Sequence, residues 1–355
     1  MQLEHRRKLA LILFNLGGPD RPSAIRPFLV NLFLDPAILR VPLLVRALLA
    51  RAIAYLRLRA ARANYALLNG SSPLLDMTRL QASALQAALP ELQVRSFIAM
   101  RYWHPFSDAT ARAVRAWRPD VVVLLPLYPQ YSTTTTASSL AAWHDAAANA
   151  GLVAATHTIC CYATDHAFVS SIATLVRVAY SQACSRLTAG TPLRVLFSAH
   201  GLPEKIISSG DPYQWQVEQT VAAVLAVWGE PDLDWTICYQ SRATPVRWIE
   251  PSTVAEIERA AREKVAVMLV PIAFVSEHSE TLVELDIEYR HLADRLGVPG
   301  YFRVPTPNAD SVFVAALAEA VRRARASTTG LNSHIGSRVC PQRYTGCPYS
   351  VRKPA

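Results

Sequence analysis

Histidine and glutamate side chains suited to proton transfer and metal binding gather in the second half of the sequence. His200 ends a short apolar run, and His278 and Glu280 follow the very apolar run 265–274. A neutral imidazole accepts protons near neutral pH, and imidazole and carboxylate groups also bind transition metals. The residue types predict proton or metal chemistry, although a lone histidine at a strand end also fits a purely structural role.

Three glutamates recur at intervals of four residues, Glu280, Glu284 and Glu288. On a helix this spacing places their carboxylates along one face. The row fits a solvated acidic face, or a proton or metal path, since crowded like charges cost stability. No further His or Cys stands at an interval typical of a closed zinc site, which favours transient handling of a metal.

Polar and aromatic residues follow other apolar runs, at 15–19, 101–105, 128–136 and 239–241. In open α/β sheets, ligands bind at the carboxyl ends of the strands, so these segments predict one hydroxyl-rich, aromatic cleft. The hydroxyl run 132–139 fits either a helix cap or a site for ligand carboxylates. Neither glycine fingerprint of nucleotide-binding loops is present.

The elements that must position these residues alternate between short apolar runs and longer helical stretches, as in parallel α/β proteins. The expected strands are 9–15, 93–99, 120–127, 153–160, 193–198, 235–239, 265–274 and 300–304. Four runs in each half predict two similar Rossmann-like domains, each with a four-stranded parallel sheet flanked by helices. We expect domains at 1–165 and 166–327, joined through a helix at about 165–187, a closing helix at 309–327, and a Cys-containing extension at 328–355.

The chain of 355 residues is 51% hydrophobic and carries a net charge of +9, which excludes a disordered protein. A basic balance permits nucleic acid, an anionic membrane or a small anion as partner, and the absence of nucleic-acid motifs disfavours the first. The N-terminal run 9–14 is too short for a signal peptide and lacks a cleavage site. No run reaches the roughly 18 apolar residues of a membrane span, so we expect a cytoplasmic protein.

The segment Arg40–Tyr65 contains six arginines, no acidic residue and many leucines. One interpretation is an ordinary packed helix whose arginines extend into water. The other is a basic, apolar lip, spanning about 26–65, that lies on an anionic bilayer.

Seven segments in order resemble the motifs of the ferrochelatase family over about residues 9–325. They are FNLGGP (14–19), RYWHP (101–105), LYPQYS (127–132), FSAHGLP (197–203), GDPY (210–213), YQSR (239–242) and PIAFVSEHSETLVELDIEY (271–289). The resemblance implies a chelatase-type fold and a lyase that inserts Fe²⁺ into protoporphyrin IX, forming haem b with release of two protons. Alternatives are a coproporphyrin III ferrochelatase and a non-catalytic tetrapyrrole carrier at the membrane surface.

The resemblance also implies site residues and partners. His200, Glu280 and His278 would be catalytic, and His200, Glu280, Glu284 and Glu288 would handle the metal. The macrocycle would be lined by Leu16, Tyr65, Arg101, Tyr102, Tyr131, Ser132, Trp248 and Phe274. The implied protein is a monomer or homodimer at the cytoplasmic membrane surface, with the 26–65 lip against the lipid and without nucleic acid.

Some family members hold a [2Fe–2S] cluster on one mid-chain cysteine and three in a C-terminal extension. Here Cys160 and Cys161 lie near the mid-chain position, while the extension supplies two cysteines, Cys340 and Cys347. A cluster of this type needs four thiolates, so these four residues are its candidate ligands, and free thiols are the alternative.

Overall fold

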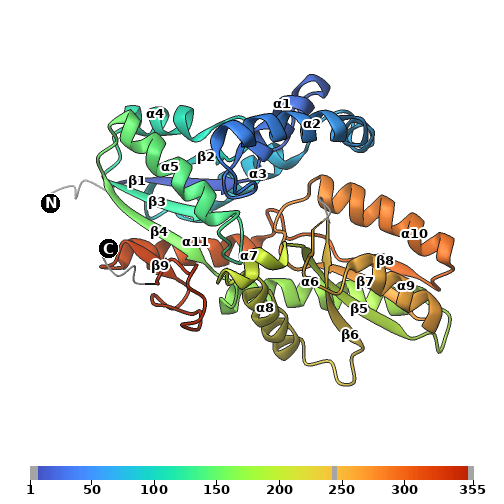
Figure 1. Cartoon of the computed structure of the whole chain (residues 1–355). Coiled ribbons are helices and arrows are strands. Elements are labelled where there is room, and N and C mark those ends of the chain that lie inside the picture. The colour runs from blue at the N-terminus through green and yellow to red at the C-terminus, as the bar shows by residue number, and fades with distance from the viewer. Residues whose placement is uncertain (1–6, 242–245, 351–355) are drawn as a thin grey trace. The chain divides into compact units, whose positions relative to one another are not determined.

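The computed structural model of the chain describes residues 7–241 and 246–350, and it divides into two compact units (Figure 1). Unit 1 comprises the described residues up to Tyr162 together with Asn308–Val339. Unit 2 comprises Ala163–Pro307 and Cys340–Ser350. Arg242 of the YQSR motif and residues 1–6 lie outside the described residues.

Unit 1 contains a parallel sheet of five strands in the order β2-β1-β3-β4-β9. The strands are β1 (Lys8–Asn15), β2 (Gln93–Met100), β3 (Val121–Pro126), β4 (Ala155–Cys161) and β9 (Leu331–Ser333). The helices are α1 (Ile25–Leu34), α2 (Leu43–Ala66), α3 (Leu74–Ala87), α4 (Ser107–Trp117), α5 (Thr136–Ala150) and α11 (Ser311–Ala326), with a short 3₁₀ turn, η1 (Pro22–Ala24). The central strands β1 and β3 are almost entirely buried, which explains their uninterrupted apolar sequences.

The expectation of four strands in this first sheet was wrong, because β9 adds a fifth. It comes from the C-terminal extension and pairs in parallel with β4 through Leu331↔Thr158 and Ser333↔Cys161. Three residues in a polar stretch show no strand periodicity, and their pairing depends on a distant part of the chain.

Helix α11 also belongs to unit 1, although we expected residues up to 327 in the second domain. Its apolar side is buried through residues such as Phe313, Leu317 and Val321. Arg322 at its exposed side donates to Glu91 and to the carbonyl of Ala88, after α3. The chain therefore returns to unit 1 after completing most of unit 2.

Unit 2 contains the predicted four-stranded parallel sheet, in the order β6-β5-β7-β8. Its strands are β5 (Leu193–His200), β6 (Trp235–Gln240), β7 (Ala266–Pro271) and β8 (Tyr301–Arg303). Its helices are α6 (His166–Arg186), α7 (Glu204–Ser208), α8 (Tyr213–Trp228), α9 (Thr253–Glu263) and α10 (Tyr289–Leu296).

The glutamate-bearing segment of unit 2 is a π-helix, η2 (Glu280–Glu288), which continues directly into α10. A helix was expected here, but side-chain spacing does not distinguish an α-helix from the wider π form. π-Helical turns are rare and occur frequently at functional sites.

Helix α2 in unit 1 presents an exposed apolar and basic surface. It packs through Ala50, Ala54 and Tyr65, whereas Leu44, Leu48 and Leu56 are 80%, 71% and 77% exposed. Across the described ranges, 7–241 and 246–350, no helix combines the length and apolarity needed to traverse a bilayer.

Candidate active site

The carboxyl ends of β5 and β6 bring two polar side chains together in unit 2. His200 ends β5 and lies in register with Gln240, which ends β6, and the Gly201 N–H donates to the Gln240 carbonyl at 2.8 Å. Strand β7 ends at Pro271, beside β5, and the chain then reaches η2 through the segment that carries His278. The sheet edge thus collects the polar residues, as in other open α/β sheets.

The Glu280 carboxylate lies between two imidazole rings. Its Oε1 is 3.8 Å from Nε2 of His200, and its Oε2 is 3.4 Å from Nε2 of His278. The His200 and Glu280 side chains are 34% and 30% exposed, and His278 is 10% exposed. Two of the three groups can therefore meet a molecule from solvent.

The ring orientation of both histidines is fixed by a backbone carbonyl. Nδ1 of His200 donates to the Gly201 carbonyl at 2.6 Å, and Nδ1 of His278 donates to the Ser276 carbonyl at 3.0 Å. A carbonyl oxygen only accepts, so in the neutral rings Nε2 carries the lone pair. Two lone pairs and a carboxylate then face one another, and this arrangement attracts a proton or a metal cation.

Glu284 is the most strongly held carboxylate of the row. Its oxygens accept hydrogen bonds from the Ser241 N–H at 2.9 Å, Gln240 Nε2 at 3.0 Å, the Tyr289 hydroxyl at 2.7 Å and the Ser241 hydroxyl. Burial raises the pKa of Glu284, and the nearby charge of Glu280 raises it further. Glu284 is therefore suited to hold a proton next to Glu280.

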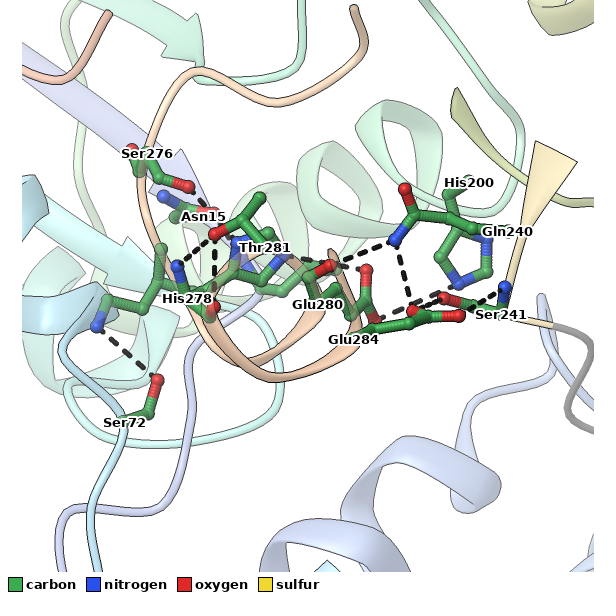
Figure 2. Close-up of polar contacts among 12 residues, drawn as sticks. Asn15, Ser72, His200, Gln240, Ser241, Ser276, His278, Glu280, Thr281 and Glu284 are labelled. Atoms are coloured by element: carbon green, nitrogen blue, oxygen red, sulfur yellow. Dashed lines mark hydrogen bonds and ion pairs between the residues drawn. The ribbon is translucent and has the colours of Figure 1, made fainter. Parts of the chain in front are cut away.

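Gln240 links the elements of this site. Its Nε2 donates to the Glu280 carbonyl at 2.9 Å and to Glu284 (Figure 2). Its Oε1 accepts from the Ser198 hydroxyl at 2.9 Å. These contacts tie β5 and β6 to the start of η2. Gln240 is almost completely buried, so it positions the carboxylates.

The three glutamates differ in environment along η2. Glu280 is partly exposed, Glu284 is nearly enclosed by its donors, and Glu288 is exposed near the end of the helix. The row runs through buried surroundings to the surface, which an ordinary solvated acidic face does not do.

A buried ion cluster supports the segment that carries His278. Arg303 of β8 contacts Glu277 at 2.7 Å and holds Asp286 of η2 through two hydrogen bonds of 2.6 and 2.7 Å. The Thr306 N–H also donates to Glu277 at 2.9 Å. Burial opposes the charged form of Glu277, but Arg303 and these hydrogen bonds outweigh burial and lower its pKa.

Among the described residues, no three His, Cys, Asp or Glu side chains are arranged as a closed metal-binding group. The Glu280 oxygens lie 3.8 and 3.4 Å from the two imidazole Nε2 atoms, a separation close to that of two ligands that each bind one metal ion at about 2 Å. The arrangement suits a metal ion that passes through as a substrate.

Two of the macrocycle-lining candidates, Arg101 and Tyr102, join a buried network in unit 1. Asp35 accepts from the Tyr102 hydroxyl at 2.8 Å and from Arg101 Nη2 at 2.9 Å, and it also accepts from the Ser138 hydroxyl. Nε of Arg101 donates to Ser138 at 2.6 Å. Tyr102 is buried and its hydroxyl is engaged, while Arg101 remains 21% exposed.

Leu16 and Tyr65 lie in the same apolar cluster as Tyr102. Tyr131 and Ser132 follow β3 and are buried, and the Ser132 hydroxyl bonds to Thr134 rather than capping α5. The structure therefore brings Leu16, Tyr65, Arg101 and Tyr102 together within unit 1.

The two remaining lining candidates belong to unit 2. Phe274 packs against the His278 ring with a centroid separation of 5.0 Å. Trp248 is buried and packs against Gly201, where an added Cβ would lie 3.4 Å from the indole. Phe274 thus contacts the ring of one catalytic candidate, His278, and Trp248 borders the backbone next to another, His200.

The cysteine candidates fall into two pairs. In unit 1, the sulfurs of Cys160 and Cys161 are 3.5 Å apart at an irregularity in the pairing of β4 with β9. In unit 2, Cys340 accepts a hydrogen bond from Gln216 at 3.1 Å, and Cys347 is buried. A cluster needs four thiolates, and each unit contributes two of the four candidates, so the structure of either unit by itself does not test the cluster.

Sequence reasoning missed several residues that organise the site. Gln240 and Ser241 were noted only as polar residues after a strand, and Tyr289, Asp35 and Arg303 were given no role in the site. Tyr289 closes the longest motif, and it bonds to Glu284. Its place five residues after Glu284 gave no signal, because residues at that spacing share a face on a π-helix and not on the α-helix that the sequence predicts.

Comparison with known proteins identifies the family of the chain. A ferrochelatase profile matches residues 8–325. The ferrochelatase of Caulobacter vibrioides is 51% identical, covering 96% of this chain and 97% of that protein, and that of Phenylobacterium zucineum is 48% identical over the same shares. The solved structure of SirB from Bacillus subtilis with Fe³⁺ shares the fold at a TM-score of 0.50, with 11% identity over 90% of this chain and 96% of that one. The chain therefore belongs to the ferrochelatase family, lyases that insert ferrous iron into a porphyrin.

Proposed function

We propose that the enzyme inserts Fe²⁺ into protoporphyrin IX, with His200, Glu280 and His278 at the reacting atoms. The observation that carries this proposal is the convergence of two imidazole Nε2 atoms on one carboxylate. Iron insertion releases two pyrrole protons, so the site needs both a proton acceptor and a group that tolerates a passing cation. Nε2 of His200 is the first acceptor, because its Nδ1 is held by a carbonyl.

The remaining carboxylates form a path that the two protons follow one after the other. Glu280 takes each proton from His200, and Glu284 holds it next, since burial favours the protonated form of Glu284. Glu288 passes it on at the surface. Imidazole and carboxylate are also acceptable transient ligands for Fe²⁺, which is a substrate here.

Glu280→Gln tests this assignment. We expect kcat for iron insertion to fall about 10²-fold, because the amide can neither accept the proton nor balance a cation. The dissociation constant for protoporphyrin, measured by fluorescence, should change less than about threefold. Glu258→Gln, an exposed glutamate on α9, is the matched control and should leave both values unchanged. A loss confined to porphyrin binding would contradict the role of Glu280.

The choice of porphyrin is tested by paired assays with protoporphyrin IX and coproporphyrin III. Faster iron insertion into coproporphyrin III, which carries four carboxylates, would show that coproporphyrin III and not protoporphyrin IX is the substrate. Tetrapyrrole binding without any iron insertion would favour a carrier function.

We further propose that α2 lies on the cytoplasmic surface of an anionic membrane. Exposed leucines and arginines share this helix, and the segment Arg40–Tyr65 has no acidic residue. Such a surface gains affinity from buried apolar side chains and from attraction to anionic lipid.

Replacing Leu44 and Leu48 with serine is expected to weaken binding to anionic vesicles at least tenfold. Each leucine contributes about 1.5–3 kcal/mol when it enters an apolar environment. Co-sedimentation with phosphatidylglycerol-containing vesicles measures the loss. Leu80→Ser, at an exposed position of α3, is the control and should bind normally. Equal binding of the double variant would reject this surface.

The [2Fe–2S] cluster on Cys160, Cys161, Cys340 and Cys347 stays a prediction, and the absorption spectrum tests it. A cluster would give visible bands together with iron and acid-labile sulfide in the purified protein. Colourless protein without labile sulfide would contradict the cluster.

A further inference from the structure

Unit 2 contains a basic cavity that the iron-insertion site does not use. Its volume is about 300 Å³, and it lies among the end of α6, the start of α10 and β8. The lining residues are Ala179, Gln182, Ala183, Arg186, Arg290, Tyr301, Phe302 and Arg303. Three guanidinium groups around one small cavity are its distinguishing feature.

Two of these arginines have uncompensated charge. Within the described residues, neither Arg186 nor Arg290 forms an ion pair with a carboxylate. Arg303 differs, because Glu277 and Asp286 neutralise it. The cavity therefore has a local excess of positive charge.

Two of the three guanidinium groups, those of Arg290 and Arg303, are held in place before any ligand arrives, and Arg186 is exposed at the end of α6. Nη1 of Arg290 donates to the Tyr301 carbonyl at 3.1 Å, and its guanidinium carbon lies 4.9 Å from the Tyr301 ring centroid. Arg303 is fixed by its two carboxylates and is only 11% exposed. Gln182 precedes Arg186 by one helical turn of α6, so both can face the same ligand.

We propose that this cavity binds a small oxyanion with two negative charges, of the phosphate or dicarboxylate class. Guanidinium groups recognise the oxygens of such anions through paired N–H donors. The volume lies at the lower end for ligand sites and suits an ion of this size rather than a porphyrin. The Gln182 amide, also in the lining, adds a neutral donor.

Binding of inorganic phosphate and of succinate to the full chain tests the proposal. In calorimetric titrations with ionic strength held constant by sodium chloride, we expect saturable binding of at least one anion, accompanied by an upward shift of Tm. Arg186→Gln/Arg290→Gln should weaken that binding at least tenfold. The relative affinities of phosphate and succinate then distinguish the two ligand classes.

Arg262→Gln/Arg295→Gln is the matched control, since both arginines are exposed and lie outside the lining. This control loses two positive charges, as the cavity variant does, and should bind the anion with wild-type affinity. Without added anion, iron insertion by the Arg186/Arg290 variant should match that of the wild type, which separates this test from that of the proposed function. Equal anion affinity in the cavity variant and the wild type, or no saturable binding in the wild type, would overturn the proposal.

Discussion

Replacing His200 with alanine is expected to abolish iron insertion, lowering the rate about 10²–10⁴-fold, the range typical for loss of a general base. Its Nδ1 is committed to the Gly201 carbonyl, so Nε2 is the atom that can take a pyrrole proton. Glu280 cannot substitute for His200, since the Glu280 carboxylate lies 3.8 Å from the position of the missing Nε2 atom. Haem formation from Fe²⁺ and protoporphyrin under anaerobic conditions measures the loss.

The fold of the His200 variant should remain intact. The side chain is one-third exposed at the end of β5, so its truncation leaves little buried cavity. Circular dichroism and porphyrin binding should resemble those of the wild type. His291→Ala, at an exposed position of α10, controls for loss of an imidazole and should turn over normally. Near-normal haem formation by the His200 variant would remove this residue from the centre of the mechanism.

Arg303→Met is expected to destabilise the enzyme by about 3–5 kcal/mol, the usual consequence of removing one partner from a buried ion pair. Glu277 would keep its charge while only 12% exposed, and Asp286 would lose two hydrogen bonds. Urea unfolding at pH 7 measures the change. Arg322→Met breaks the exposed contact with Glu91 and should leave stability nearly unaltered.

The pH dependence of this effect follows from Glu277. In the wild type its pKa lies below the usual value, so the cluster stabilises the fold above about pH 4.3 and loses that contribution as the pH falls through the folded pKa. Without Arg303, burial instead raises this pKa. The loss of folding free energy caused by Arg303→Met should therefore be largest at neutral pH and become smaller toward pH 4. Adding Glu277→Gln should restore part of the stability at pH 7, and a deficit independent of pH would contradict this origin.

Strand positions were accessible from sequence because their apolar runs are long and both faces of each central strand are buried. The position of His200 followed from the same pattern, since it ends such a run. Its partnership with Glu280 was implied by the family resemblance and not by spacing, because 80 residues separate them and the pairing of β5 with β7 brings them close.

Other features depend on contacts that composition and spacing do not encode. The row of glutamates predicted a helix, but the π form depends on backbone hydrogen-bond register. Tyr102 has the character of a ligand-stacking residue, whereas its hydroxyl is bound by Asp35 from a distant turn. Arg303 resembles any strand arginine until Glu277 and Asp286 are placed around it.

The pairing of β9 with β4 gives the C-terminal extension a protective function. A parallel strand at the edge of a sheet offers unpaired N–H and C=O groups to other chains, and an uncovered edge promotes aggregation. Leu331–Ser333 covers this edge beside Cys160 and Cys161, and the Thr158 N–H donates to Gly330 at 2.7 Å. Removing the extension would therefore leave the backbone N–H and C=O groups of β4 unpaired beside two thiols. We expect the shortened protein to aggregate more readily than the full chain.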